Sequence, residues 1–374
     1  MFCVLCGLPS SFDYFVSFVD SPLLQSMTNT SPIYEPNPDV FADYQTPYKL
    51  GRPILAPSGI PGEFDCLGAD NMRIFRHHGH FYATYIGFDG VGYQTAMAVS
   101  DDLLNWTKLG VIMPRGSRNA WDRVGRAISC WLHDVDLYGE RDLITHQGRH
   151  WMFYHAYPAP GYETGAAANG LAWTTDPAFR DWHFLDQPVF SKGPDDAWDG
   201  GGLYSVWVVP YQNSFRLYYN GKDHLHWPWH EQAGLAFSTD GSLEHWRRYE
   251  HNPVHPVASS GWDSVFACGQ HVLWDSRRHQ WVQFFCGFDG SHARDGVSVS
   301  DDGILWRRCP TPLLDVGEPD SLDATHAHKP CIIWHNGALY HFYCAVRPTR
   351  TDDERRRFGH EYRCLTVACS RPLN

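Results

Sequence analysis

The sequence has no long apolar run, no excess of basic residues and no sustained helical period. No apolar stretch reaches the ~18–20 residues that a membrane-spanning helix needs, so we expect no membrane partner. Acidic residues outnumber basic ones by 42 to 30, and the net charge of −12 argues against a nucleic-acid partner. The absence of a 3.6-residue period, together with 33 Gly and 25 Pro, predicts a chain of strands and turns.

The 11 cysteines are an odd number, which does not suit a framework of disulfides. Several of them fall among apolar residues of expected strands, where a free thiol behaves as a small apolar group. Examples are Cys286, Cys331, Cys344 and Cys369. Residues 1–19 are apolar, but they lack a basic start and contain Asp13, so they resemble a secretion signal only weakly. Together these features favour a cytoplasmic over a secreted location.

What the sequence does contain is one phrase repeated five times. Each copy has a bulky apolar residue followed by Asp, then a strand, a tight turn, an aromatic strand and a strand of small residues. The marker aspartates are Asp65, Asp122, Asp199, Asp263 and Asp323, which we interpret as structural hydrogen-bonding residues because every copy has one. A repeat of ~60–75 residues with four short strands is typical of a propeller blade. The fold expected is therefore all-β: a five-bladed β-propeller with four-stranded antiparallel blades.

The two ends of the chain complete each other in this scheme. The last copy has no outer strand, whereas Pro53-Ile54-Leu55 has the pattern of one and precedes the first copy. Because an unpaired edge exposes backbone donors and acceptors, we predict that this N-terminal strand pairs with the C-terminal blade and closes the ring. Residues 1–50 are expected to form an irregular arm, through which a homo-oligomer could assemble, and residues 51–374 a single domain.

A ring of blades has a centre, and the first strand of each blade should line it. Counting five residues from the marker aspartates places Asp70, Tyr204, Cys268 and His328 at the mouth. In the second blade we expect an insertion before the strand, and counting back from the next turn gives Gly139, followed by Glu140. The side-chain period of two then directs Asp70 and Met72 into the channel, and Asn71 and Arg73 towards the next blade.

The loops between second and third strands should lie on the same face as this mouth. They contain Asp89, Glu163, Arg294 and the segment from Trp227 to Glu231. Acids, histidines and aromatic side chains that converge on one rim predict a polar, aromatic-walled pocket. Its expected occupant is a carbohydrate or another small molecule.

The blade number, the opening strand from Asp70 to Gly79-His80-Phe81-Tyr82 and the phrase Leu103-Leu104-Asn105-Trp106 carry a resemblance. Over residues 50–370 the chain resembles the five-bladed glycosidase superfamily. That superfamily includes arabinanase/xylosidase-type (family 43), invertase-type (family 32) and anhydrogalactosidase-type (family 117) hydrolases. The resemblance places Asp70 where these enzymes have their general base or nucleophile. The chain departs at Gly139 and Tyr204, where family 43 and family 32 enzymes have Asp and Glu.

Glycoside hydrolysis needs a carboxylate and a proton donor on opposite sides of the anomeric carbon. We expect Asp70 to be the base or nucleophile, and Glu231, surrounded by aromatic residues, to be the donor. Glu163 and His328 are alternative donors, the latter because the anhydrogalactosidase type is thought to use a histidine. Residues expected to bind substrate are Tyr204, Trp227, Trp229, Asp89, Arg294 and Glu140. No cofactor is required by this chemistry, and a cation in the channel near His328 is an open alternative.

The function expected is therefore exo-acting hydrolysis of a small glycoside or of an oligosaccharide end. Two other functions stay open, because the mouth lacks two of the acids that the resemblance would supply. One is a sugar-binding propeller without hydrolytic activity. The other is a lyase or cyclase that acts on a small metabolite with the same rim of residues.

Overall fold

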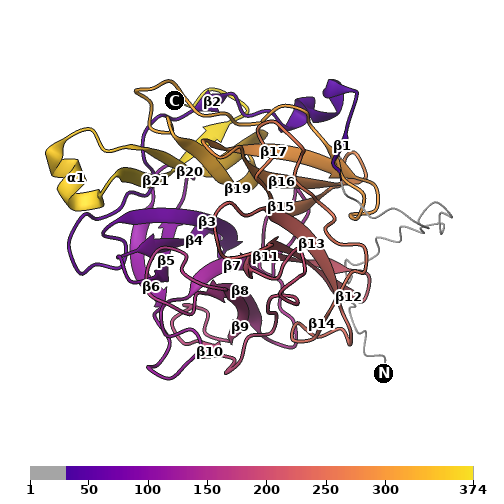
Figure 1. Ribbon diagram of the computed structural model, residues 1–374, viewed down its shortest axis with the longest axis horizontal. Coiled ribbons are helices and arrows are strands. Elements are labelled where there is room, and N and C mark those ends of the chain that lie inside the picture. The colour runs from indigo at the N-terminus through magenta and orange to yellow at the C-terminus, as the bar shows by residue number, and fades with distance from the viewer. Residues whose placement is uncertain (1–30, 374) are drawn as a thin grey trace, which may run out of the picture.

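The computed structural model describes residues 31–373 and is almost entirely β within them (Figure 1). Its helices there are the short 3₁₀ helix η2 (Pro38–Tyr44) and helix α1 (Asp352–Phe358). No helix among these residues is long and apolar enough to cross a membrane. The nearly all-β architecture agrees with the class predicted from the sequence.

From β3 onwards the strands form consecutive antiparallel groups. The first group is a four-stranded sheet of β3 (Gly68–His77), β4 (His80–Phe88), β5 (Tyr93–Ser100) and β6 (Thr107–Met113). The second is a four-stranded sheet of β7 (Ala127–Trp131), β8 (His150–Ala156), β9 (Ala168–Thr174) and β10 (His183–Phe184). Four-stranded antiparallel sheets of this kind fit a propeller.

Three more groups follow and belong to one larger sheet. The third contains β11 (Gly202–Tyr211), β12 (Ser214–Lys222), β13 (Glu231–Ser238) and β14 (Trp246–Arg248). The fourth contains β15 (Phe266–Asp275), β16 (Gln280–Phe288), β17 (Ala293–Ser300) and β18 (Arg307–Arg308). The last contains β19 (His326–His335), β20 (Ala338–Pro348) and β21 (Glu361–Cys369), and β2 (Tyr48–Lys49) pairs with its final strand. Short parallel contacts from β13 to β15 and from β17 to β19 join these groups into one sheet.

Every marker aspartate is buried and forms an ion pair with a basic side chain. The pairs are Asp65–Lys108, Asp122–Arg126, Asp199–Arg248, Asp263–Arg308 and Asp323–Lys49, with N–O distances of 2.6–2.8 Å. Each cation also lies near the ring of an aromatic residue of the second strand. A buried carboxylate without a partner would be costly, so the repeated Asp in the sequence marks a repeated electrostatic contact.

The position of the cation is also repeated. Lys108, Arg248 and Arg308 lie on the fourth strand of their groups, opposite a small residue of the third strand. In the second group Phe184 holds that register position opposite Ala172. There Arg126 replaces the missing cation, and its guanidinium lies 3.6 Å from the centre of the Phe184 ring.

The first strand of each group has a register shift near its start. The shifts fall between Asp70 and Arg73, Ile128 and Cys130, Leu203 and Val206, Gly269 and His271, and His328 and Cys331. A bulge of this kind changes which side chains point to which face of a strand. The strict period of two is therefore the wrong rule at the start of these strands.

The prediction that Gly139 and Glu140 lie at the mouth of the second group is wrong. The first strand of that group, β7, begins at Ala127, which lies five residues after Asp122 and so holds the position of the mouth residues in the other groups. The insertion follows this strand instead of preceding it. Glu140 is exposed and forms an ion pair with Arg76. Counting back from the following turn cannot locate the start of the first strand, because any insertion between that strand and the turn adds its own length to the count.

The N-terminal segment packs along the last and fourth groups. Strand β1 (Ile33–Tyr34) pairs with β18, and the buried Tyr44 donates a hydrogen bond of 2.6 Å to Asp275. Strand β2 pairs with Ala368 and Cys369, and Leu55 bridges to Leu365. Residues 48–55 thus run beside β21, with the regular pairing at residues 48–49 and a single bridge in the expected strand 53–55. Residues 1–30 of the expected arm lie outside the described part of the chain.

Across residues 31–373, each of the nine cysteines is buried and none is in a disulfide. Cys286, Cys331, Cys344 and Cys369 all lie on strands, as expected of thiols that act as small apolar groups.

Lys49→Met should destabilise the protein strongly. The substitution leaves the buried carboxylate of Asp323 without its cation. Since both partners are largely shielded from water, we expect the loss to cost about 3 kcal/mol of unfolding free energy. Urea denaturation measures the loss. The matched control is Arg356→Met, which breaks the exposed pair with Asp353 and should cost less than about 0.5 kcal/mol. Equal effects of the two substitutions would contradict the argument.

Candidate active site

A cavity of about 520 Å³ lies where the first strands begin and the loops between second and third strands meet. Its wall includes residues from every strand group. Six of the residues predicted from the sequence line it: Glu163, Glu231, His328, Tyr204, Trp227 and Trp229. Cys268, which the five-residue count also placed at the mouth, lines it as well. The pocket predicted from converging acids and aromatic residues is therefore present.

Glu231 is the first residue of β13 and is only 8% exposed. Both of its carboxylate oxygens have a partner: the Trp229 indole N–H donates to Oε1 at 2.8 Å, and the Cys268 thiol donates to Oε2 at 3.3 Å. Burial and then the negative charge of Glu163 raise the pKa of Glu231 to about 7, against the smaller opposing effects of Trp229, Lys222 and Cys268. A carboxyl group with this pKa can hold a proton near neutral pH.

Glu163 approaches the cavity from the loop between β8 and β9. It is half-buried, and its Oε1 accepts a hydrogen bond of 3.2 Å from the Tyr93 hydroxyl. Its backbone φ is +50°, a left-handed conformation that non-glycine residues adopt at a cost in free energy. Such strained residues cluster at functional sites, and two other cavity residues, Asn71 and Lys329, share the conformation.

Two cations face the cavity, and one buried carboxylate holds both. Lys329 and Arg363 line the wall, and each donates to Oδ2 of Asp70, at 2.5 and 3.1 Å respectively. Burial alone would lower the pKa of Lys329, but the charge of Asp70 raises it above its ordinary value. Arg363 also contacts Glu361, at 3.2 Å.

Asp70 itself does not line the cavity. It is 1% exposed, and although burial opposes ionisation, the charges of Lys329 and Arg363 bring its pKa well below its usual range. The bulge after Asp70 and the φ of +44° at Asn71 direct the Asn71 side chain to the cavity instead. The expectation that Asp70 points into the cavity is therefore wrong. Asn71 contacts the next strand group as expected, because its Nδ2 donates to the Ile128 carbonyl at 2.9 Å, but it also lines the cavity. This geometry favours a role for Asp70 behind the wall.

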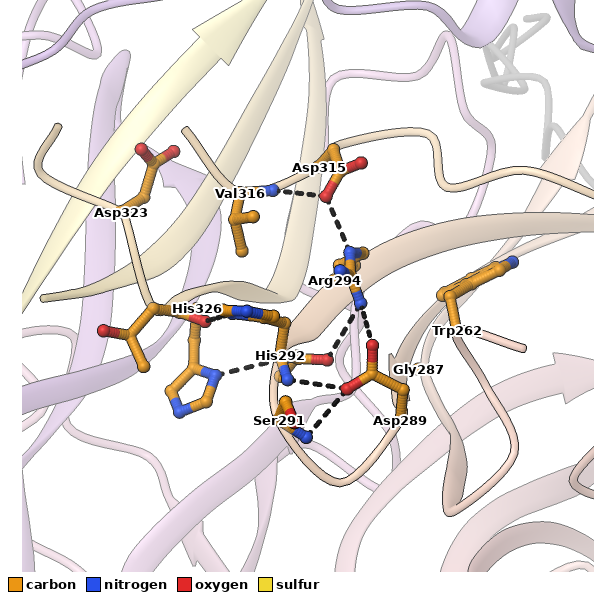
Figure 2. A network of polar contacts seen from close by, with 12 residues as sticks. Trp262, Gly287, Asp289, Ser291, His292, Arg294, Asp315, Val316, Asp323 and His326 are labelled. Carbon is orange, nitrogen blue, oxygen red and sulfur yellow. Dashed lines mark hydrogen bonds and ion pairs between the residues drawn. The ribbon is translucent and has the colours of Figure 1, made fainter. Parts of the chain in front are cut away.

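Asp89 and Arg294, expected to bind substrate, form turn contacts outside the cavity wall. Figure 2 shows Arg294 between Asp289 and Asp315, with N–O distances of 2.7 and 2.6 Å. Asp289 also accepts from the backbone N–H groups of Ser291 and His292. Asp89 repeats this arrangement with Val91, Gly92 and Arg115 in the first group. The shared Gly-Phe-Asp-Gly phrase thus builds an ion-paired turn.

Several lining residues were not selected from the sequence. Asn71, Ser205 and Lys329 all fall six residues after a marker aspartate, next to the mouth position, and the bulge brings them to the cavity. Counting six residues from each marker aspartate would have identified these three residues if the position of the bulge had been known. Arg363, His155 and Asn220 carry no such signal, because they lie on second and third strands without a repeated phrase.

The histidines of the wall are held neutral. His328 is buried, and burial and then the charge of Lys329 place its pKa well below the ordinary value. Burial lowers the pKa of His326 to about 4, and its Nδ1 accepts from the backbone N–H of Ala293. In the part of the chain that the structure describes, no three His, Cys, Asp or Glu side chains are grouped to hold a metal ion. A cation near His328 stays a prediction, which the neighbouring ammonium and guanidinium groups oppose.

Neither a protein-family model nor a curated protein matches the chain. Among solved structures, that of BT0996 in a complex with RGII is 28% identical with a TM-score of 0.75, and the match covers 90% of this chain and 95% of that one. A second, described as a glycoside hydrolase, is 27% identical with a TM-score of 0.74 over the same shares.

More distant structures share the fold. Zg3597, a family 117 glycoside hydrolase of the marine bacterium Zobellia galactanivorans, has a TM-score of 0.58 at 13% identity and covers 86% of this chain and 90% of its own. A thermostable family-43 glycoside hydrolase also has a TM-score of 0.58 at 13% identity, over 82% and 94% of the two chains. The resemblance to propeller-type glycoside hydrolases that the sequence indicated is confirmed, and the neighbours support a glycoside hydrolase function.

Glu231→Gln should remove a pH dependence of stability. Folding raises the pKa of Glu231 from 4.5 to about 7, so the stability gained from its protonated form is complete below pH 4.5 and is lost as the pH rises through 7. Between pH 4.5 and 7.5 the wild type should lose about 3 kcal/mol relative to the variant. Urea denaturation of both proteins across this range measures the difference. Parallel stability curves would contradict the raised pKa.

Proposed function

We propose that this protein is an exo-acting glycoside hydrolase in which Glu231 is the general acid and Glu163 the base or nucleophile. The observation that carries the proposal is that two carboxylates from different strand groups face one cavity in unlike surroundings. Glu231 is buried among Trp229 and Cys268, with a pKa of about 7, whereas Glu163 is half-buried beside a tyrosine hydroxyl. Carboxylates in contrasting environments suit the two roles that glycoside hydrolysis requires.

In this mechanism Glu231 protonates the oxygen of the leaving group as the glycosidic bond breaks. Glu163 carries the negative charge on the other side of the reacting carbon, where it attacks directly or removes a proton from water. The Tyr93 hydroxyl holds Oε1 of Glu163 in place. The influence of Glu163 on the pKa of Glu231 supports a shared site, because it means that the two carboxylates are close enough to interact.

The proposed role of Asp70 is to balance charge. The transition state of glycoside hydrolysis has oxocarbenium character and is therefore positive. Lys329 and Arg363 would destabilise it if their charges were uncompensated, and the buried carboxylate of Asp70 contacts both. Asp70 then acts through its two partners and does not contact the substrate.

Buried polar groups of the cavity wall support exo action, in which one terminal sugar unit is bound and removed. Four buried residues that line it have side-chain atoms without a hydrogen-bond partner within residues 31–373. These atoms are Asn71 Oδ1, Ser205 Oγ, His328 Nδ1 and both amide atoms of Asn220. Neutral polar groups of this kind suit the hydroxyls of a sugar. Trp227 and Trp229, whose ring centroids are 5.1 Å apart, offer an aromatic wall on which a sugar ring can stack.

We also propose that the strand groups are the five blades of one closed ring. The repeated ion pair and the repeated bulge support a count of five. Lys49 and β2, which supply the missing cation and the missing outer strand of the last group, support closure by the N-terminal segment. The similarity to BT0996, solved in a complex with RGII, makes oligosaccharides of RGII the first natural substrates to test.

Chemical rescue should separate the roles of the carboxylates. With an activated aryl glycoside, Glu163→Ala should lower kcat at least 10³-fold, and added azide should restore much of the rate, because a small anion can replace a missing nucleophile or base. Asp70→Ala should also be slow, but azide should not restore it, because the carboxylate acts behind the wall. Rates are followed by release of the phenol, and the circular dichroism of each variant is the control for folding.

The opposite pattern, with rescue of Asp70→Ala alone, would return the role of base to Asp70. No hydrolysis of any aryl furanoside or pyranoside by the wild type would leave the sugar-binding, lyase and cyclase functions. Glycan binding without turnover would select the first of these, and binding of a non-sugar metabolite would select the others.

Ser205→Ala should stabilise the free protein and weaken catalysis. The Ser205 hydroxyl is buried without a partner, so its removal should raise the unfolding free energy by up to about 1 kcal/mol, while kcat/KM falls about 10-fold through a lost bond to the sugar. Thermal melts and kinetics measure both effects. The matched control is Ser129→Ala on the bulge of β7, whose hydroxyl contacts His155 and whose loss should destabilise. Loss of stability in both variants would contradict a ligand-binding role for Ser205.

A further inference from the structure

A cysteine contacts the proposed acid inside the cavity. Cys268, on β15, is 3% exposed and lines the cavity. Its Sγ lies 3.3 Å from Oε2 of Glu231, on the oxygen that Trp229 does not contact. The neighbouring strand places Cys286 directly opposite in the ladder, also on the cavity wall.

A thiol differs from other partners that could hold this oxygen. Backbone N–H and hydroxyl donors form strong bonds to an ionised carboxylate and so favour loss of its proton. An S–H group is a weak donor, and its sulfur is a weak acceptor. It can therefore hold Oε2 when Glu231 is ionised and accept from the carboxylic O–H when Glu231 is protonated, without strongly favouring either form.

We propose that Cys268 is a positioning residue for Glu231: its thiol fixes the carboxyl group in the cavity while leaving it able to keep its proton at neutral pH. The inference rests on the proposed role of Glu231 as the general acid. It adds a residue that contributes to the upper pH limit of the reaction, since the acid must be protonated to act.

Other groups that face Glu231 act on the same proton, and the Cys268 variants leave all of them unchanged. The Glu163 carboxylate reaches it from the β8–β9 loop, and the Lys222 ammonium lies on β12, directly opposite Glu231 in the ladder. The hydroxyls of Tyr157 and Tyr204 and the thiol of Cys286 also lie near enough to interact with it. Lys222 is tied to Tyr204 by a hydrogen bond of 2.8 Å.

The proton on Glu231 can be followed without a substrate. The Trp229 indole N–H donates to the other carboxylate oxygen, so its NMR resonance should shift as Glu231 ionises. The full chain labelled with ¹⁵N-tryptophan is titrated from pH 5 to 9, and Trp229→Phe identifies the resonance. The wild type should titrate with a midpoint near 7.

Cys268→Ser and Cys268→Ala should move this midpoint in opposite directions. The serine hydroxyl is the stronger donor to a carboxylate and should lower the midpoint by about one pH unit. Alanine removes the weak donor and should raise the midpoint by a few tenths of a unit. Cys286→Ser is the matched control: its side chain faces the same cavity but contacts the Gly287 carbonyl, so the midpoint should stay within about 0.3 unit of wild type.

Equal midpoints in wild type, Cys268→Ser and Cys268→Ala would overturn the inference, as would an upward shift with serine. The basic limb of kcat/KM against pH, with an aryl glycoside, should move with the NMR midpoint in each variant. If the midpoints move but no variant or wild type hydrolyses a glycoside, Cys268 still controls the proton of Glu231 and the proposed hydrolysis is what fails. If one variant does not fold, the midpoint of the other against wild type decides the question.

Discussion

The structure depends on one electrostatic contact that is made five times. In each strand group a buried aspartate binds a cation close to an aromatic ring. In the first, third and fourth groups this contact joins the segment before the first strand to the fourth strand of the same group. Removing two charges from water is costly, so such a pair is stable only when both partners are present and well placed. The second group shows how strict the requirement is. Its outer strand has Phe184 where others have a cation, and Arg126 supplies the charge from elsewhere.

The site depends on how the groups differ. The aspartate pairs make the scaffold regular, and the loops between second and third strands bring unlike side chains to one cavity. Glu163 comes from the second group, Glu231 from the third, Cys268 from the fourth and Lys329 from the fifth. Two carboxylates therefore face one cavity although neither lies in a repeated phrase, and Lys329, paired with the buried Asp70, forms part of its wall.

Much of this arrangement could be predicted from the sequence, because repetition shows in residue types. The marker aspartates, the aromatic strands and the loops that carry Glu163, Glu231, Trp227 and Trp229 were all identified in this way. What could not be predicted is set by backbone geometry. A bulge after Asp70 leaves this residue behind the cavity wall and brings Asn71 to the cavity, and no residue type in the sequence indicates the bulge. The prediction that Gly139 lies at the mouth fails for a related reason: the length of an insertion does not reveal on which side of a strand it falls.

The contact between Lys49 and Asp323 joins residues 274 positions apart in the chain. Native pairs of such separation are slow to form, because a long stretch of chain must be ordered before the contact contributes. During synthesis the N-terminal strand leaves the ribosome long before its partner exists. The last strand group can reach its final form only after β21 has been made, so the pairing of β2 with β21 should be a late step of folding and the point at which an incomplete chain is most exposed to aggregation.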